Sequence, residues 1–167
     1  MKKLHSAATI ALSAIAFVIY MLFYDILIPG IPNGSYRLAV GPLFAVPALL
    51  LLIGQVAIGG LMILFAVSSL KGEKLSGNNF SKSLLVASVI TLLFAFTYVI
   101  YPLYGPFYYI VFATGSAPAG VIFVEAAWTV VMIAASTLLI KKLHGIKMSH
   151  ALLIAVMSII FITVAAS

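Results

Sequence analysis

Long apolar stretches, separated by short polar or proline- and glycine-rich segments, dominate the pattern of this chain. A helix needs roughly 20 apolar residues to cross the roughly 30 Å hydrocarbon core of a bilayer. We predict spanning helices over residues 7–28, 44–69, 83–101, 119–140 and 150–166, each bound being approximate. The pattern therefore predicts an all-α integral membrane protein, a compact bundle of about five transmembrane helices that forms a single domain over residues 1–167.

The segments between the spans contain residues that end helices. Proline lacks the backbone donor that a helix interior needs, and glycine is entropically costly there. Pro42 and Pro47 allow the first part of the second apolar stretch, Leu38–Gly54, to form a separate interfacial helix. The clearest breaks are Pro29–Gly34, Lys71–Lys82 and Lys141–Ser149.

The basic residues are distributed unevenly over these connections. With five crossings, eight lysines fall on one side of the membrane and Arg37 alone on the other. Because cytoplasmic connections carry the excess of lysine and arginine, this distribution predicts a cytoplasmic N-terminus and an external C-terminus. The net charge of +6 then reflects the orientation of the chain in the membrane and the contact of its lysines with anionic lipid head groups. We therefore expect no nucleic-acid partner. The lysines are Lys2, Lys3, Lys71, Lys74, Lys82, Lys141, Lys142 and Lys147.

The composition excludes several classes of protein. Hydrophobic residues make up 65% of the chain and charged residues 7%, whereas soluble domains are about 45–50% apolar and about 25% charged. A soluble enzyme is therefore excluded. The absence of cysteine excludes a disulfide scaffold and thiolate metal sites. We expect an integral protein of a prokaryotic plasma membrane, with its first span retained as an anchor helix and not cleaved as a signal peptide.

Each span has a face of small or polar residues at helical spacing, which is the kind of face that packs closely against other helices in lipid. We expect these faces to point into the bundle. The faces comprise Ala7, Ala11, Ala14, Val18 and Met21; Ala45, Ala48, Gln55, Gly59 and Ala66; Ser88, Thr91, Ala95 and Tyr98; Glu125, Trp128 or Thr129, Met132 and Ser136; and Ala151, Ala155, Ser158 and Ala165.

Two carboxylates at membrane depth, Asp25 and Glu125, are the first candidates for chemistry. As a pair with raised pKa values they could relay protons or bind a cation or a quinol head group. Alternatively, either could form an ion pair with Arg37 that ties the outer loop to the bundle. The candidate polar or quinol site comprises Asp25, Arg37, Gln55, Tyr98, Glu125 and Trp128.

Aromatic and histidine residues refine this picture. The tyrosine-rich stretch Tyr98–Tyr109 is typical of an aromatic belt at the membrane interface, and a quinone site or a docking edge is the alternative. His5, His144 and His150 lie in or beside the lysine-bearing segments, where we expect them to be solvated. Since no pair of mid-span histidines is present, we expect no haem, no metal site and no other cofactor.

Three functions are compatible with these features. The favoured hypothesis is a non-catalytic subunit of a larger membrane complex, respiratory or otherwise energy-transducing and linked to an oxidase or a quinol. Its partners would be membrane lipids and other integral membrane subunits that contact the small-residue and tyrosine-rich faces. The alternative is a small permease or substrate-binding module of a transporter. An intramembrane enzyme has the least support, because no nucleophile and base can be assembled from these residues.

Overall fold

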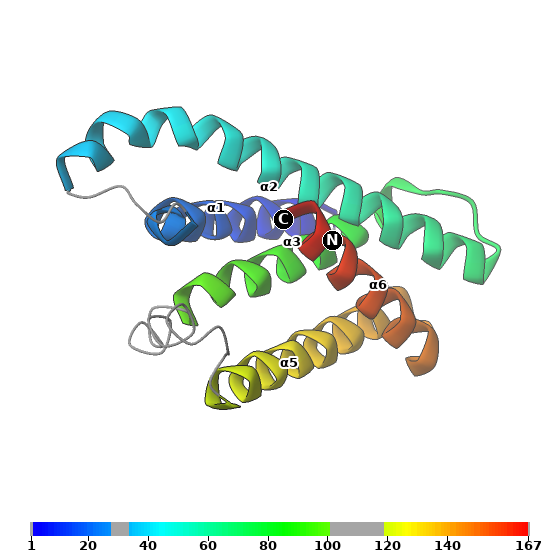
Figure 1. The fold of residues 1–167 in the computed structure, drawn as a ribbon. Coiled ribbons are helices and arrows are strands. Elements are labelled where there is room, and N and C mark those ends of the chain that lie inside the picture. Colours follow the sequence, from blue (N-terminus) through cyan, green and yellow to red (C-terminus); the bar gives the residue numbers. More distant parts are fainter. Residues whose placement is uncertain (1, 28–33, 101–118, 167) are drawn as a thin grey trace.

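The computed structural model describes residues 2–27, 34–100 and 119–166, and describes side chains over 3–21, 45–46, 48–97 and 122–163. In these ranges every secondary-structure element is an α-helix, which confirms the all-α prediction (Figure 1). The helices are α1 (Lys2–Leu27), α2 (Gly34–Lys71), α3 (Gly77–Ile100), α5 (Ala119–His144) and α6 (Met148–Ala166).

Four of the described helices are long and apolar enough to cross a membrane. This result is compatible with a helical, multi-pass membrane protein. The described apolar part of α6, Met148–Thr163, is shorter, so a fifth crossing and the orientation of the termini stay predictions. The four stretches are Lys3–Met21, Ala48–Lys71, Gly77–Thr97 and Ile122–His144.

Helix α2 is longer than a membrane requires. Its 38 residues extend for about 57 Å at a rise of about 1.5 Å per residue, and the hydrocarbon core is about 30 Å thick. The helix continues through Pro42 and Pro47. Leu38–Gly54 therefore lies within the continuous helix α2 and is not a separate interfacial helix.

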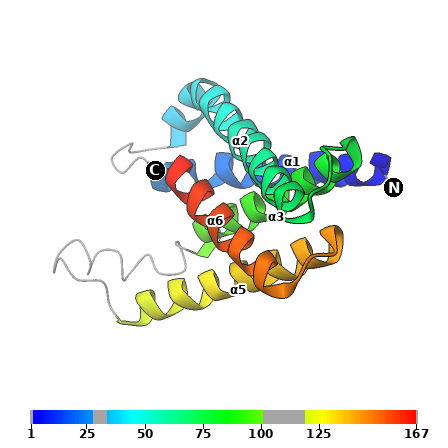
Figure 2. The ribbon, with the colours of Figure 1, turned by 90° about the vertical axis from the view of Figure 1, so that its right-hand side faces the viewer.

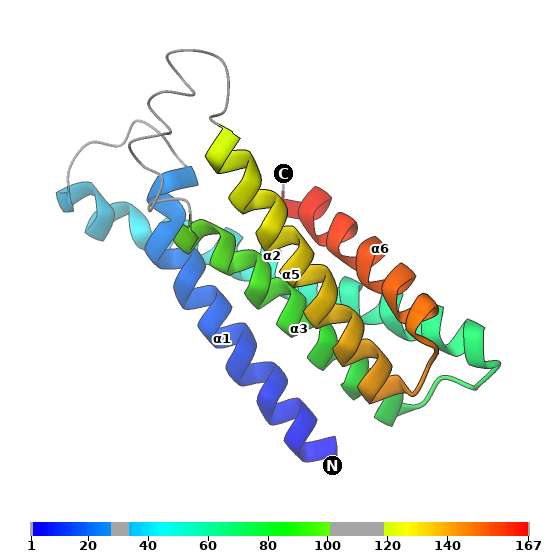
Figure 3. The ribbon, with the colours of Figure 1, turned by 90° about the horizontal axis from the view of Figure 1, so that it is seen from below.

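Helix α3 lies at the centre of the bundle and packs against α1, α2, α5 and α6. Figure 3 shows α1 and α5 on opposite sides of α3. Helix α6 packs against α5 and α2 (Figure 2). The flanking helices are the less enclosed ones. Buried residues make up 17% of the apolar windows of α1 and α5, compared with 44% for α2 and 39% for α3.

The close contact between α2 and α3 depends on Gly60. A Cβ atom placed on Gly60 would lie 2.7 Å from Cδ2 of Leu84 and 3.3 Å from the Leu84 Cα. The neighbouring Gly59 is less tightly enclosed, since its Cβ would lie 3.5 Å from the Cβ of Ala87. Only the absence of a side chain at Gly60 lets the two backbones approach this closely.

Two apolar clusters hold the helices together. The larger one joins α2, α3, α5 and α6 and is centred on isoleucines such as Ile63, Ile90 and Ile162. The smaller one joins α1 to α2 and α3 through Ala16, Ile19, Tyr20, Leu52 and Ala95. Helix α1 is thus attached to the bundle by a cluster of its own.

Two glycines close the helix ends nearest the lysines. Gly72 after α2 has a φ of 62° and Gly145 after α5 a φ of 64°, values at which a Cβ is strained. The Gly145 amide donates to the Lys141 carbonyl at 2.8 Å, the bond expected of a left-handed helix cap. This cap produces the short turn from α5 into α6.

The described residues of the predicted small-residue faces are buried on α3 and α6, and on α2 they are buried or half-buried. Gln55, Thr91 and Ala155 are examples, each at most 1% exposed. On α1 the prediction is wrong, because Ala7, Ala11, Ala14 and Val18 are exposed. The bundle buries a neighbouring face of α1 instead, which contains Ala16 and Tyr20. The buried face supplies a hydrogen-bonding group, the Tyr20 hydroxyl. The exposed face of Ala7, Ala11 and Ala14, which we call the alanine face, supplies none.

Candidate functional site

A polar contact lies at membrane depth between α1 and α2. The Tyr20 hydroxyl donates a hydrogen bond to Oε1 of Gln55 at 3.0 Å, and both side chains are buried. A buried amide needs partners because an unsatisfied polar group in an apolar medium is costly. Among the described residues, Nε2 of Gln55 has no hydrogen-bond partner. The pair is a contact between a hydroxyl and an amide that joins two helices.

Helix α3 adds hydroxyl groups to the same region. Thr91 is fully buried, and its Oγ1 also has no partner among the described residues. Along α3 it lies one turn from Ala95, which shares a cluster with Leu52 of α2 and Tyr20. One turn in the other direction, Ser88 accepts a 3.5 Å hydrogen bond from Ser13 of α1. Polar groups of three helices therefore lie along about two turns of the bundle.

Trp128 and Glu125 on α5 have different surroundings, although they are one turn apart. The Trp128 Nε1 donates to the Leu93 carbonyl at 3.3 Å, which anchors α5 to the central helix. Glu125, which the small-residue pattern placed toward the interior, is exposed on the outer side of α5. It lies about 24 Å along the helix from Lys141 at about 1.5 Å per residue. A carboxylate there is within about one turn of the far edge of the hydrocarbon core.

The hydrogen bonds of the described residues do not join the predicted site residues into one site. Gln55 bonds Tyr20 and Trp128 bonds Leu93. The backbones of Asp25, Arg37 and Tyr98 belong to α1, α2 and α3, but their side chains lie outside the described residues, as does the rest of the tyrosine-rich stretch. The quinol or proton site, and the ion pairs with Arg37, stay predictions.

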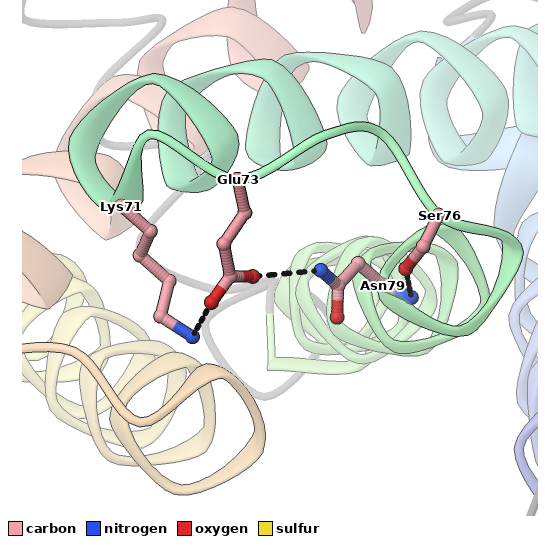
Figure 4. A network of polar contacts seen from close by, with 4 residues as sticks. All are labelled: Lys71, Glu73, Ser76 and Asn79. Atoms are coloured by element: carbon pink, nitrogen blue, oxygen red, sulfur yellow. Dashed lines mark hydrogen bonds and ion pairs between the residues drawn. The ribbon is translucent and has the colours of Figure 1, made fainter.

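At the lysine-rich end of the bundle, Glu73 organises the connection between α2 and α3 (Figure 4). Its carboxylate lies 2.9 Å from the Lys71 Nζ and accepts a hydrogen bond from the Asn79 side chain at 3.2 Å. The Ser76 hydroxyl caps α3 by accepting a hydrogen bond from the backbone N–H of Asn79 at 3.2 Å. The hydrogen-bonded Lys71 ammonium holds the pKa of Glu73 below its ordinary value of 4.5, and Asn79 and Lys82 act in the same direction.

His144 was expected to be solvated, and this expectation is wrong. The residue is 4% exposed, and its Nε2 lies 3.5 Å from the Ser83 Oγ of α3. The helix ends at His144, and its buried face carries the imidazole against α3. The contact joins α5 to the start of the central helix. Over the part of the chain that the structure describes, His, Asp and Glu form no group of three suited to a metal ion.

Tyr20 and His144 form buried contacts between helices. The sequence analysis did not include either of them among the candidate site residues. A sequence signal existed for Tyr20, because its hydroxyl lies in an apolar span and a buried hydroxyl needs a partner. For His144 the signal was weaker. It follows the apolar Ile140 by one turn and so shares a helix face with it, but its basic neighbours suggested an exposed segment.

Comparison of the chain with protein-family models, curated proteins and solved structures gives no match.

Proposed function

We propose that this chain is a non-catalytic subunit of a larger membrane complex, held in the bilayer next to the transmembrane helices of other proteins. The observation that carries the proposal is the exposed small-residue face of α1, formed by Ala7, Ala11 and Ala14. In lipid, bulky apolar residues are as well accommodated as small ones, so a small-residue face offers an advantage only where another helix packs closely against it.

The flanking position of α1 supports this proposal. The helix uses one face, around Ala16 and Tyr20, to join the bundle, and leaves the alanine face available. Buried residues form 17% of its apolar window, so most of the helix surface is free to contact lipid or a partner. A partner helix with small residues of its own could approach to the short distances typical of such pairs.

Glu125 gives further support from the opposite flank. It is an exposed carboxylate on α5, and carboxylates that face lipid are costly unless they reach the interface or find a partner. A basic or hydroxyl group on a neighbouring subunit would satisfy it. In the finer form of the proposal, the complex is respiratory or otherwise energy-transducing and lies in a prokaryotic plasma membrane, with Glu125 bordering a quinol or proton route.

The test is purification of the tagged chain from its native membrane in a mild detergent. We expect other integral membrane proteins to co-purify, and an Ala11→Leu substitution to reduce their yield because it blocks close approach. The matched control is Ile10→Leu on the same helix, where a bulky exposed residue is replaced by another. A haem spectrum or quinol oxidation by the co-purified complex tests its energy-transducing character.

Two results would contradict this proposal. The first is migration of the wild-type chain as a lone 17.7 kDa species. The second is an equal yield of partners for the Ala11→Leu and Ile10→Leu variants, which would remove the α1 face from the interface.

One observation favours a second candidate, a small permease or substrate-binding module. Nε2 of Gln55 and Oγ1 of Thr91 are buried polar atoms without partners among the described residues, and a polar solute could bind them. Uptake measurements on a Gln55→Leu variant test this candidate. Unchanged uptake of every solute that the wild-type protein transports would count against it.

A further inference from the structure

An open apolar groove of about 310 Å³ lies between α5 and α6, near the turn that joins them. Its walls include Val130, Ala134, Thr137 and Leu138 of α5 and Met148 and Leu152 of α6. Most of these residues are exposed, so the groove is on the outer surface of the bundle. Figure 2 shows the two helices as neighbours joined by a short turn.

The groove presents hydrocarbon to its occupant. Thr137 is the polar residue in its lining, and the Thr137 hydroxyl donates to the Ile133 carbonyl at 2.7 Å. The hydroxyl is therefore satisfied within α5, and the groove has no buried polar atom that would demand a polar ligand. Within a membrane, a lipid acyl chain is the occupant that matches these walls. An acyl chain alone gives no selectivity, because every lipid has one.

Selectivity would come from the lysines at the end of the groove. Lys141 follows Thr137 by four residues, so it lies on the same face of α5, about 6 Å further along the helix. Lys147 directly precedes Met148, and the left-handed conformation of Gly145 turns the chain so that α6 begins beside α5. Both lysines are exposed, and neither forms an ion pair within the described residues.

The charge around this end of the groove is mainly positive, because Glu73, the acidic group near His144, is paired with Lys71. Lys142 is also exposed there, and the sequence contains no acidic residue after Glu125. Basic residues between transmembrane helices at this depth attract anionic head groups, and lysine side chains can extend along apolar surface to reach them. We propose that the α5–α6 groove binds an anionic phospholipid, with an acyl chain in the groove and the phosphate held by Lys141 and Lys147.

Native mass spectrometry of the full chain released from nanodiscs tests this proposal. The nanodiscs contain equal amounts of phosphatidylglycerol and phosphatidylcholine with identical acyl chains. We expect the wild-type chain to retain phosphatidylglycerol in preference to phosphatidylcholine. Because each lysine near an anionic head group contributes substantially, the K141Q/K147Q variant should lose this preference by on the order of tenfold. The single variants K141Q and K147Q give the same information if the double variant does not fold.

Two matched variants separate the groove from general surface charge. K3Q/K74Q removes the same charge from two exposed lysines outside the α5–α6 turn and should leave the preference unchanged. Ala134→Phe fills the exposed groove without changing charge and should reduce retention of both lipids.

The proposal is overturned by equal retention of the two lipids by the wild-type chain. It is also overturned if K3Q/K74Q acts as strongly as K141Q/K147Q, or if Ala134→Phe changes nothing. Lipid-independent protection of an Ala134→Cys variant from maleimide labelling would assign the groove to a second copy or a partner helix, and would overturn it as well.

Discussion

The hydrogen bond between the Tyr20 hydroxyl and the Gln55 amide is buried in the bundle. Water therefore cannot replace either hydrogen-bond partner when the other is removed. Hydrogen bonds between membrane helices contribute modestly, about 0.6 kcal/mol on average and up to about 2 kcal/mol. Their removal is asymmetric, because a stranded buried group also loses its solvation. The two single substitutions should therefore cost more in sum than the simultaneous loss of both partners.

We predict that Tyr20→Phe destabilises the protein by about 0.5–2 kcal/mol, because it leaves Oε1 of Gln55 without its donor. Gln55→Leu should cost a similar amount. The double variant should be less destabilised than the sum of the two single variants. Unfolding free energies measured by steric trapping in bicelles check this double-mutant cycle. Strictly additive costs would show that the two side chains are not coupled.

At the scale of the elements, the tightest contact made by a glycine of the described residues is the crossing of α2 and α3 at Gly60. Three glycines of α2 provide a graded series. A Cβ at Gly60 would clash with Leu84, one at Gly59 would make an ordinary contact, and one at Gly54 would meet nothing within 4 Å. The series separates the effect of helix packing from that of helix propensity, which favours alanine over glycine at every position.

We predict that Gly60→Ala is less stable than Gly54→Ala by about 1–3 kcal/mol, the usual cost of overpacking. The side chain of Leu84 can rotate away, but its Cα cannot move without separating the helices. Gly59→Ala should lie close to Gly54→Ala. Thermal unfolding in one detergent, followed by circular dichroism, ranks the three variants. A Gly60→Ala protein as stable as the Gly54→Ala protein would show that α2 and α3 are not in tight contact there.

At the scale of the whole molecule, α3 forms the centre and the other helices surround it. The lysines mark the ends of helices, and the apolar side chains face both the two clusters and the exterior. Such a distribution suits a bundle whose outer surface meets lipid. The orientation of the bundle then follows from the lysines, and the number of crossings depends on whether α6 completes a span.

Because the chain has no cysteine, single introduced cysteines can test this topology without a background signal. We predict that Lys74→Cys and Lys147→Cys react with a membrane-impermeant maleimide only after cells are permeabilised. Asn33→Cys and Ser167→Cys should react in intact cells, because their segments lie on the outer side in the five-span arrangement. If Ser167→Cys is labelled like Lys147→Cys, then α6 does not cross the membrane.

Much of this architecture could be predicted from the sequence. The helices lie where the apolar stretches are, since backbone groups in lipid must be satisfied within a helix. Gln55 and Thr91 were correctly expected to be buried. The buried face of α1 and the burial of His144 could not be predicted, because each depends on groups from distant parts of the chain. Ser88 selects the Ser13 side of α1, and Ser83 faces His144.

The sequence by itself determined the helical class, the approximate positions of the helices and the uneven distribution of charge. These properties are local, because span length, helix-ending residues and lysine content act within a single segment. Only the tertiary structure decided which face each helix buries. Helix α1 has two faces that could pack, and the contacts of Tyr20 and Ser13 with α2 and α3 determine which one does. The alanine face stays on the surface of the bundle because its side chains allow another helix to pack closely but form no hydrogen bond with it.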